Sequence, residues 1–475
     1  MNPIRFRAPL AIALGALLTA CAGLPERAVD AAPELPAQYA DALPTAEAAL
    51  DARWWRAFSD PDLDALVEQG LAYNSDLVIG AARLRESAAA LRQVRAARLP
   101  DIGASVGGTR QRAPSTAAPG ETVVSESGSF GLDIGYEVDL WGRLATQSEA
   151  ERQRYLAQGF AQASLRQVIA AELVRSYLTA QAAAANRVTL EENLTLLEES
   201  LALAERRHAL GVISELDLLR SRSELEDSRA QLADVNRRYD AARRALLVLA
   251  GQMPSQDALD ALSVRALTLA PDDLPQVPVG LPSELLERRP DLRAAEAQLA
   301  AAHADVSAAR RALLPQLSLT AAAGRASGDL SDLIRGPHLD IWSIGANLVA
   351  TLFDGGRRRG AIEAAQARQA QLVETYRDAI RNALRETLDA LDAREAAALI
   401  HESRLAQAAA LADAARLADR RYQEGYDSYL NVIDARRSLL NARQAVIEAR
   451  RAAGSAYVDL SLALGGGWEA DAEAP

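Results

Sequence analysis

Two hydrophobic periods alternate along the chain, and together they predict long helices that connect short pairs of strands. Over residues 129–140 the even positions are apolar and the odd positions are small or acidic. Such strict alternation is typical of a strand with one apolar face. Weaker alternation over 101–110 predicts its partner, and similar runs at 317–323 and 342–352 predict a second pair of strands. Residues 111–128 are rich in Pro, Ser, Thr and Gly, which predicts a surface loop between the first two strands.

The other long stretches carry Leu and Ala at helical spacing and contain no proline. Leu190, Leu194, Leu197 and Leu201 are separated by steps of four, three and four, which is the spacing of a coiled-coil seam. The predicted helices are 76–99, 144–210, 214–251, 291–314, 357–424 and 428–464. At ~1.5 Å per residue, the two longest would each span about 100 Å. One medium helix stacked on one short helix would nearly match that length, which predicts a layered wall of helices.

The chain contains an internal duplication, with one unit repeated in tandem. Gly211 matches Gly425 at an offset of 214 residues, and Pro100 matches Pro315 at an offset of 215. Such a period is far too long for a solenoid repeat, so we expect two copies of a domain-sized unit. The predicted division is 1–20 signal peptide, 21–75 tether and equatorial segment, 76–251 first repeat, 252–282 equatorial connector, 283–465 second repeat and 466–475 tail.

Each of the two matched glycines predicts a tight turn between two helical arms, here called a tip. Glycine ends helices readily because it adopts the left-handed conformation that other residues resist. After the second tip, Asp427 or Ser428 is expected to cap the next helix with a side-chain oxygen. The predicted tip residues are Gly211, Val212, Ile213, Gly425, Tyr426, Asp427 and Ser428.

The N-terminus reads as a secretion signal, with two arginines followed by the apolar run 8–18 and then Leu-Thr-Ala-Cys21. Small residues before a cysteine are similar to the processing box of bacterial lipoproteins, after which Cys21 would be acylated. Ala22 at the next position is compatible with sorting to the outer membrane. The alternative is a structural cysteine, although a lone Cys excludes an internal disulfide. Beyond the signal, no run of 18 apolar residues predicts a transmembrane helix.

Composition and charge exclude several functions. The net charge is −12 and all 52 basic residues are arginines interleaved with acids, which argues against a nucleic-acid track. The four histidines are dispersed, and His401-Glu402 has Leu405 where a zinc-protease box would place its second histidine. A phosphate-binding loop needs a lysine, and the chain has none. We therefore expect no catalytic residues, no metal site and no cofactor.

The strands require neighbours from other chains. Their length is close to the ~9–11 residues of a tilted membrane strand, and four strands cannot close a membrane barrel. An open edge in lipid would leave backbone groups unpaired, so several copies must form a ring. The alternatives are soluble hairpins packed on helices, or a structural coiled-coil or adaptor-type envelope lipoprotein.

Several motifs along the chain belong together: the Cys21 box, Trp54-Trp55-x-x-Phe-x-Asp-x-x-Leu, Asn74-x-Asp76-Leu77, both tips, Leu430-x-Val432-x-Asp434-Ala435 and Gly465-Gly466-Gly467-Trp468. In these motifs the chain resembles the TolC-like outer-membrane efflux channels, in the lipoprotein branch that serves RND-type pumps. The resemblance covers nearly the whole mature chain and implies an outer-membrane homotrimer. Its fold would be mainly α, with a 12-helix tube across the periplasm and a 12-stranded membrane barrel to which each chain contributes four strands. The partners would be a periplasmic adaptor (membrane fusion protein) and an inner-membrane RND-type pump, which load the tube with drugs or other small molecules.

The same resemblance implies a gate at the tips, where the adaptor would also dock. Asp434 falls where an acidic residue rings the constricted periplasmic end. Asp217 and Tyr422, with Arg421 beside it, fall where bonds between hairpins hold the tip closed. The chain departs from the family pattern at Asn431, often a second acid, so the ring should be less charged. It also departs at Asp427, which replaces a basic residue of some relatives and its usual tip salt bridge.

Overall fold

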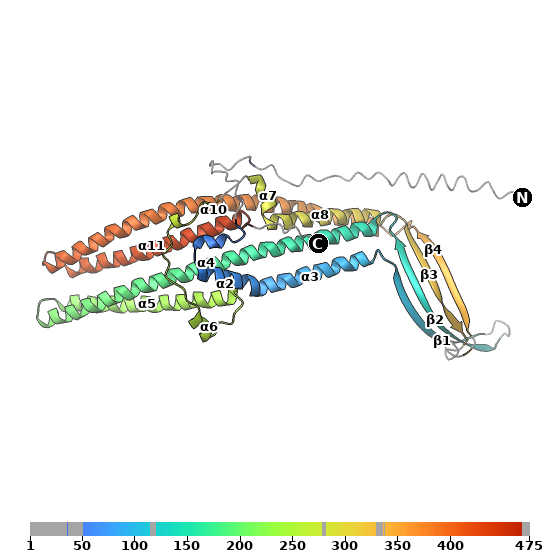
Figure 1. The fold of residues 1–475 in the computed structure, drawn as a ribbon, viewed down its shortest axis with the longest axis horizontal. Helices are drawn as coiled ribbons and strands as arrows, with labels where there is room; N and C mark the ends of the chain where they lie inside the picture. Colours follow the sequence, from blue (N-terminus) through green and yellow to red (C-terminus); the bar gives the residue numbers. More distant parts are fainter. Residues whose placement is uncertain are drawn as a thin grey trace.

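The computed structural model describes residues 36, 51–114, 120–277, 282–328, 336 and 338–467. The molecule is elongated, with a small sheet at one end and the tips of two helical hairpins at the other (Figure 1). Short helices and connecting segments cluster around its middle, here called the waist. Cys21, the predicted signal peptide and tether up to residue 50 (apart from residue 36), and Trp468 with the rest of the tail lie outside the described residues.

The predicted helices and strands are present, with ends that differ by a few residues. Two helices of 67 residues, α4 and α10, form the first arms of the hairpins, and two of 35 residues, α5 and α11, form the return arms. In chain order the elements are η1 Trp54–Phe58, α2 Pro61–Tyr73, α3 Ser75–Ala96, β1 Asp101–Pro114, β2 Thr122–Val138, α4 Arg143–Ala209, α5 Glu215–Leu249, α6 Gln256–Ala261, η2 Pro271–Asp273, η3 Pro282–Glu284, α7 Leu285–Arg288, α8 Pro290–Arg311, β3 Gln316–Ser327, β4 Leu339–Val349, α10 Arg357–Gln423 and α11 Tyr429–Ala463.

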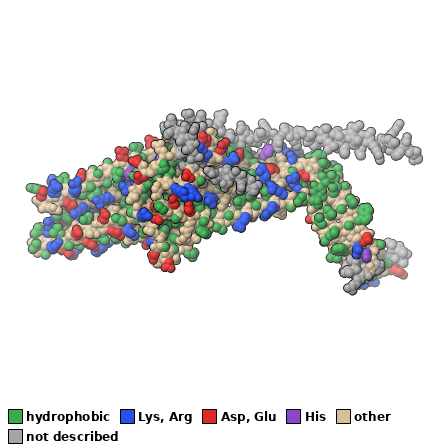
Figure 2. Space-filling view, viewed as in Figure 1, with side chains coloured by type: hydrophobic (Ala, Val, Ile, Leu, Met, Phe, Trp, Pro, Cys, Tyr) green, Lys and Arg blue, Asp and Glu red, His purple; other side chains and the backbone are tan. Residues whose placement is uncertain are grey.

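The strands form one antiparallel sheet in the order β1-β2-β3-β4. Its register aligns the apolar positions across all four strands: Ile102 lies opposite Ile134, Ile134 opposite Ala321, and Ala321 opposite Ile344. One face of the sheet is therefore apolar over its half next to the helices, and at the far end the same face carries the ion pairs of Arg110 with Glu126 and of Arg325 with Asp340. Figure 2 shows hydrophobic side chains gathered over the strands, whereas charges of both signs are spread along the helices.

Two predictions about the strands were wrong. The expected loop 111–128 is largely strand, because β1 continues to Pro114 and β2 begins at Thr122. Backbone pairing needs no apolar side chains, so the ladder extends through this polar sequence. The fourth strand ends at Val349 instead of continuing to 352. Val349 pairs with Gln316, the first residue of β3, and Pro315 before it has no N–H to extend the ladder.

Helices and strands share one lateral order. In the half of the molecule next to the sheet, α3 packs against α4, α4 against α8, and α8 against α10. In the half that carries the tips, the order is α5, α4, α11 and α10. One edge of the chain is thus made of β1, α3 and α5, and the other of β4 and α10 (Figure 1).

At the waist each return helix stacks end to end on a short helix, at a contact here called a joint. Gly251 follows α5 with φ +75°, and a Cβ there would lie 2.4 Å from the Tyr73 carbonyl oxygen. Gly465 follows α11 with φ +96°, and a Cβ there would lie 2.4 Å from the Arg288 carbonyl oxygen. Only glycine allows both the left-handed backbone and this close approach. The two repeats therefore build the same joint.

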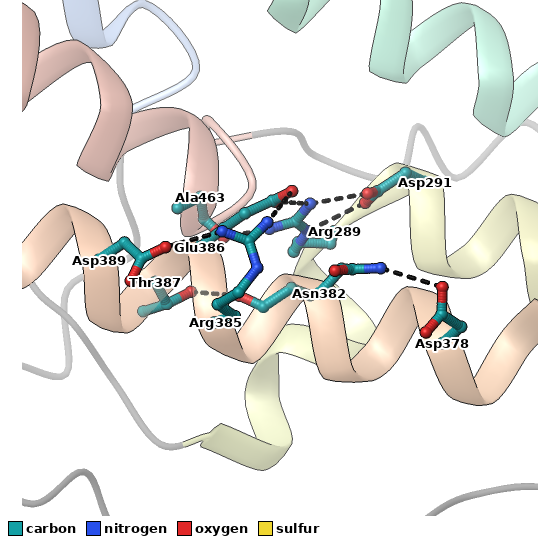
Figure 3. Close-up of polar contacts among 10 residues, drawn as sticks. Arg289, Asp291, Asp378, Asn382, Arg385, Glu386, Thr387, Asp389 and Ala463 are labelled. Atoms are coloured by element: carbon teal, nitrogen blue, oxygen red, sulfur yellow. Dashed lines mark hydrogen bonds and ion pairs between the residues drawn. The ribbon is translucent and has the colours of Figure 1, made fainter.

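A side chain bonds across each joint, and its chemistry differs between the repeats. Asn74, which is 4% exposed, donates to the Leu249 carbonyl at 2.9 Å. Its counterpart Arg289 donates to the Ala463 carbonyl at 3.1 Å (Figure 3). The acceptors are the last residues of α5 and α11. In both repeats the bond gives the carbonyl at the end of a helix a partner that the helix itself does not supply.

Arg289 is also the centre of an ion-pair cluster. Its guanidinium lies 2.7 Å from the Asp291 carboxylate and 2.8 Å from that of Glu386 on α10 (Figure 3). Hydrogen bonds and ion pairs to these acids hold the pKa of Arg289 above its ordinary value, although desolvation by burial is the largest single influence and opposes them. The second joint thus ties α8, α10 and α11 together.

The largest buried cluster also lies at the waist. Trp54 and Trp55 of η1 pack edge to face, with ring centroids 5.9 Å apart, against the middle of α4. Tyr177, only 1% exposed, donates its hydroxyl hydrogen to Asp60 at 2.9 Å. Burial, and then this hydrogen bond, raise the pKa of Tyr177 far above its ordinary value. Among the described helices, none is both long and apolar enough to cross a membrane.

Candidate functional site

Both tips have the same turn. Gly211 and Gly425 have φ values of +69° and +83°, as the sequence predicts for glycine turns. In each tip the N–H groups of the glycine and of the next residue bond back to carbonyls in the last turn of the first arm, at 2.8–3.1 Å. These two bonds satisfy carbonyls that the helix end would leave unpaired. The turns are therefore tight and defined by the backbone.

The tips present apolar side chains to solvent. Leu210 is 79% exposed and Val212 is 67% exposed on the first tip. Tyr426 is 75% exposed on the second, while Ile213 is half-buried. A single exposed apolar residue needs no explanation, but Leu210 and Val212 lie side by side at the end of the first hairpin, and Tyr426 lies at the end of the second.

At the first tip Asp217 has local contacts. Ser214 caps α5: its Oγ accepts the Asp217 N–H at 3.2 Å and donates to the Asp217 carboxylate at 2.8 Å. The same carboxylate lies 3.8 Å from Arg220. Within one chain, the contacts described for Asp217 do not include the expected partners Tyr422 and Arg421.

At the second tip Asp427 organises the turn. Its carboxylate accepts the Ser428 N–H at 3.0 Å and the side-chain amide of Asn431, and it lies 3.3 Å from Arg421. Ser428 occupies the capping position of α11 but makes no side-chain capping bond, so of the two predicted caps only Asp427 accepts a backbone N–H. The Asn431 bond, then the Ser428 bond and the Arg421 charge, lower the pKa of Asp427. Asn431, noted as a departure, is thus a partner of Asp427.

Tyr422 connects the two hairpins. Its ring is half-buried and packs on Tyr429, with centroids 5.3 Å apart. The guanidinium of Arg207, at the end of α4, lies 5.7 Å from the centre of the Tyr422 ring. A cation over an aromatic face at this distance is attractive. Arg207 is not among the gate residues predicted from the sequence, although it is the counterpart of Arg421 in the other repeat.

Arm-to-arm ion pairs lie behind each tip. Arg222 pairs with Glu205 at 3.0 Å, and Arg436 pairs with Asp419 at 2.8 Å. The two arginines are 214 residues apart, and so are the two acids, so the repeat offset could have identified these pairs. Asp434 lies nearby on α11 and is exposed. In the described part of the chain, no three His, Cys, Asp or Glu side chains come together as metal ligands would.

The sequence matches the family described as outer membrane efflux protein, over residues 66–252 and 281–466. The chain belongs to this family. The two matched ranges correspond to the two repeats, so the family pattern occurs once in each. An outer-membrane exit duct of an efflux pump is the function that this membership gives to the chain.

Individual relatives cover nearly the whole chain. Outer membrane protein OprJ of Pseudomonas aeruginosa is 35% identical over 462 residues, which are 97% of this chain and 95% of OprJ. Pyoverdine export outer membrane protein OpmQ of the same organism is 34% identical over 465 residues, 96% of each chain. Cation efflux system protein CusC of Escherichia coli is 31% identical over 476 residues. A solved structure of CusC has a TM-score of 0.82, covering 93% of this chain and 99% of that one.

Proposed function

We propose that three copies of this efflux protein close into a tube that conducts small molecules out of the cell, gated at its tips. The observation that carries the proposal is the shared lateral order of sheet and helices. Because β1, α3 and α5 form one edge and β4 and α10 the other, a single head-to-tail contact joins two copies in both layers. Repetition of such a contact generates a closed ring when the rotation between copies permits it.

The sheet supports a membrane location for one end of the tube. The apolar half of one face fits lipid, and the opposite face carries small and polar residues such as Ser105 and Asp133, whose side chains bond at 2.9 Å. Both edge strands need partners in lipid, since an unpaired backbone group there costs several kcal/mol. Three copies would supply a closed barrel of 12 strands.

The other end of the tube is proposed to meet the pump. The exposed apolar residues of the tips would dock a periplasmic adaptor, which connects the duct to an inner-membrane RND-type pump. The names of the relatives indicate different cargoes, pyoverdine for OpmQ and cations for CusC. We therefore assign no cargo narrower than drugs and other small molecules, and no reaction or cofactor.

Cys21 is proposed to carry the lipid anchor in the outer membrane. The motivation is the Leu-Thr-Ala-Cys box after an apolar run. Labelling with a radioactive fatty acid should mark the wild type and leave Cys21→Ser unlabelled. Equal labelling of the two proteins would contradict the anchor and leave the channel proposal intact.

Channel function is tested on the purified protein. An unheated sample should migrate as an SDS-resistant trimer that heating converts to monomer, and planar bilayers should show discrete conductance steps. A coiled-coil or adaptor-type lipoprotein would give no conductance. That result, with the protein in the outer-membrane fraction, would overturn the proposal.

The gate is tested with a double substitution. If Asp217 accepts bonds from Tyr422 or Arg421 of a neighbouring hairpin, Asp217→Ala with Tyr422→Phe removes charge-assisted bonds of ~1.5–3 kcal/mol in every copy at once. Single-channel conductance should rise. The matched control is Glu215→Ala with Tyr426→Phe, which changes exposed residues of the same types on the same tips.

Unchanged conductance in the Asp217 and Tyr422 double variant, with trimer levels normal, would move the gate elsewhere. Asp434→Ala should keep the closed state and remove block by multivalent cations, because a ring of carboxylates is a site for such ions. Persistent block would exclude Asp434 from the ring.

A further inference from the structure

At the waist, the equatorial connector crosses the groove between the two arms of each hairpin. Over the first hairpin, Tyr239 of α5 donates its hydroxyl hydrogen to the Val264 carbonyl at 3.3 Å. Over the second, Arg394 of α10 donates to the Pro275 carbonyl at 2.9 Å. The connector element η2 contacts both α10 and α11. The two grooves are thus corresponding places in the two repeats, and each is covered by a different part of the same connector.

The first groove is filled by an aromatic ring that contacts two cations. Tyr239 is 7% exposed. The guanidinium carbon of Arg187 on α4 lies 4.9 Å from the centre of its ring, and that of Arg243 on α5 lies 5.1 Å from it. A cation over an aromatic face at these distances is attractive. The chain itself therefore supplies the ring that this groove holds.

The second groove lacks that ring. Ala453 stands 214 residues after Tyr239, in the corresponding position of α11. A cavity of about 270 Å³ lies at this place, between the connector and the two arms, and Ala453 lines it together with Ala397, Ala398 and Tyr457. An apolar cavity of ~150 Å³ is enough to hold benzene. The second groove therefore has room for a ring that carries a further group.

A positive charge without an acidic partner also lines the cavity. In the part of the chain that the structure describes, Arg394 makes no ion pair, and its hydrogen bond goes to the uncharged Pro275 carbonyl although a guanidinium has five N–H donors. Burial lowers the pKa of Arg394, because desolvation disfavours the charged form. The corresponding residue of the first groove is Ala180, so this cation belongs to the second groove alone. An anionic group in the cavity would supply the missing counter-charge.

Two further polar groups next to the cavity lack partners. His401 lies one turn from Ala397 along α10 and is 7% exposed. Among the described residues, no group bonds its Nε2, and none bonds the buried Nε of Arg450 on α11. Burial, and then the charge of Arg450, lower the pKa of His401, while Asp272 opposes them. Asp272 is the acid among the residues described as lining the cavity, so two guanidinium groups stand against one carboxylate there.

We propose that the cavity of the second groove binds a small aromatic carboxylic acid as its carboxylate. The ring would lie against Ala397 and Ala453, where the first groove holds the ring of Tyr239. The carboxylate would accept hydrogen bonds from Arg394, and such bonds are short and strong because both groups are charged. The site lies within one chain, so it goes beyond the proposed function and depends on neither the trimer nor the gate.

The test measures binding of radiolabelled benzoate to the purified protein in detergent by equilibrium dialysis. Benzoate has one ring and one carboxylate, so it carries both groups that the cavity selects. We expect saturable binding to the wild type and an unfolding temperature that rises with benzoate concentration, because a ligand that binds only the folded chain stabilises it. Phenol, which has the ring without the charge, and acetate, which has the charge without the ring, should each bind on the order of tenfold more weakly.

Two substitutions and a control locate the site. Ala453→Tyr gives the second groove the ring that the first groove has, so it should abolish saturable binding, and it also measures the benzoate that dissolves in detergent. Arg394→Met removes the charged partner and should weaken benzoate on the order of tenfold while leaving phenol binding unchanged. Arg404→Met, which changes an exposed arginine farther along the same helix, should bind benzoate as the wild type does. If Ala453→Tyr does not fold, Ala398→Phe at the exposed edge of the cavity takes its place.

Absence of saturable benzoate binding to the wild type would overturn the inference, and so would binding that the cavity-filling variant and Arg394→Met leave unchanged. Acetate that binds as tightly as benzoate would refute the aromatic part of the assignment, and phenol that binds as tightly would refute the acidic part. A protein that forms no trimer and does not conduct would overturn the proposed function and leave this site intact.

Discussion

Replacing Arg289 by methionine should destabilise the waist more than any neighbouring charge change. Methionine keeps the unbranched apolar stem of the side chain and removes its donors and its charge. The side chain of Arg289 is 10% exposed, and its guanidinium donates to two carboxylates and to the Ala463 carbonyl. The substitution therefore leaves a helix-end carbonyl without its partner and two acids without their cation.

The magnitude follows from how far each partner can rehydrate. Breaking one side of a fully buried ion pair costs ~3–5 kcal/mol. Asp291 and Glu386 are 42% and 44% exposed, so water replaces part of the lost interaction. The carbonyl bond adds about 1 kcal/mol. We expect the free energy of unfolding to fall by about 2–3 kcal/mol per chain.

The assay is the loss of helical circular dichroism on heating the protein in detergent, compared at one scan rate because unfolding of such assemblies is irreversible. The control is Arg385→Met, one turn before Asp389 on the same helix. Arg385 is 59% exposed and pairs with the exposed Asp389, so its loss should cost about 0.5 kcal/mol or less. Equal thermal shifts for the two variants would refute the argument that burial of Arg289 decides the cost.

Three further predictions concern the backbone, the tip and the sheet. Gly465→Ala should unfold at a much lower temperature than Gly425→Ala. Both glycines have positive φ, but only at Gly465 would a Cβ lie against backbone, 2.4 Å from a carbonyl oxygen. Similar unfolding temperatures for the two variants would contradict this. Bonds made in the folded tip lower the pKa of Asp427, so its carboxylate stabilises the first turn of α11 at pH values above the ordinary Asp range near pH 4. This stabilisation is lost as the pH falls through the lowered pKa. Protection of the amide hydrogens in that turn should therefore decrease in acid in the wild type and stay low at all pH values in Asp427→Ala. Ile134→Arg should cost ~2–4 kcal/mol and impair assembly in membranes, whereas Asp133→Arg should be tolerated. Equal yields of trimer from the two variants would contradict the proposed assignment of the two faces of the sheet.

Helix positions and the pairing of strands within each repeat could be predicted because both depend on local patterns. The glycine turns followed from two residues whose backbone conformation few others adopt, and both have positive φ. The polar part of the sheet, from Thr122 to residue 128, could not be recognised by hydrophobic alternation. There the strands are held by backbone pairing and by polar side chains such as Arg110, which lies 2.9 Å from Glu126, and composition indicated a loop.

The tip contacts were less predictable because they depend on which side chains two arms bring together. Asp427 was recognised as a possible cap, but its bond to Asn431 depends on the first turn of α11. Asp217 was expected to reach Tyr422 or Arg421, and in one chain its described contacts are to Ser214 and Arg220. A bond between hairpins of different copies stays a prediction, since it requires an assembled ring.

The two repeats also indicate what holds this architecture constant while side chains diverge. At the joints, glycines approach backbone carbonyls, and the polar bond across each joint ends on a backbone carbonyl. A carbonyl acceptor is present whatever the residue, so asparagine in one repeat and arginine in the other can meet the same requirement. The ion pair between the two hairpins, Arg437 of α11 with Glu224 of α5 at 2.6 Å, depends on side chains at both ends, and there a single substitution removes the bond. Divergence after duplication therefore leaves the joints alike, whereas a side-chain contact present at one place can be absent at its counterpart: Ser223 and Ser438, 214 residues from Arg437 and Glu224, cannot form an ion pair.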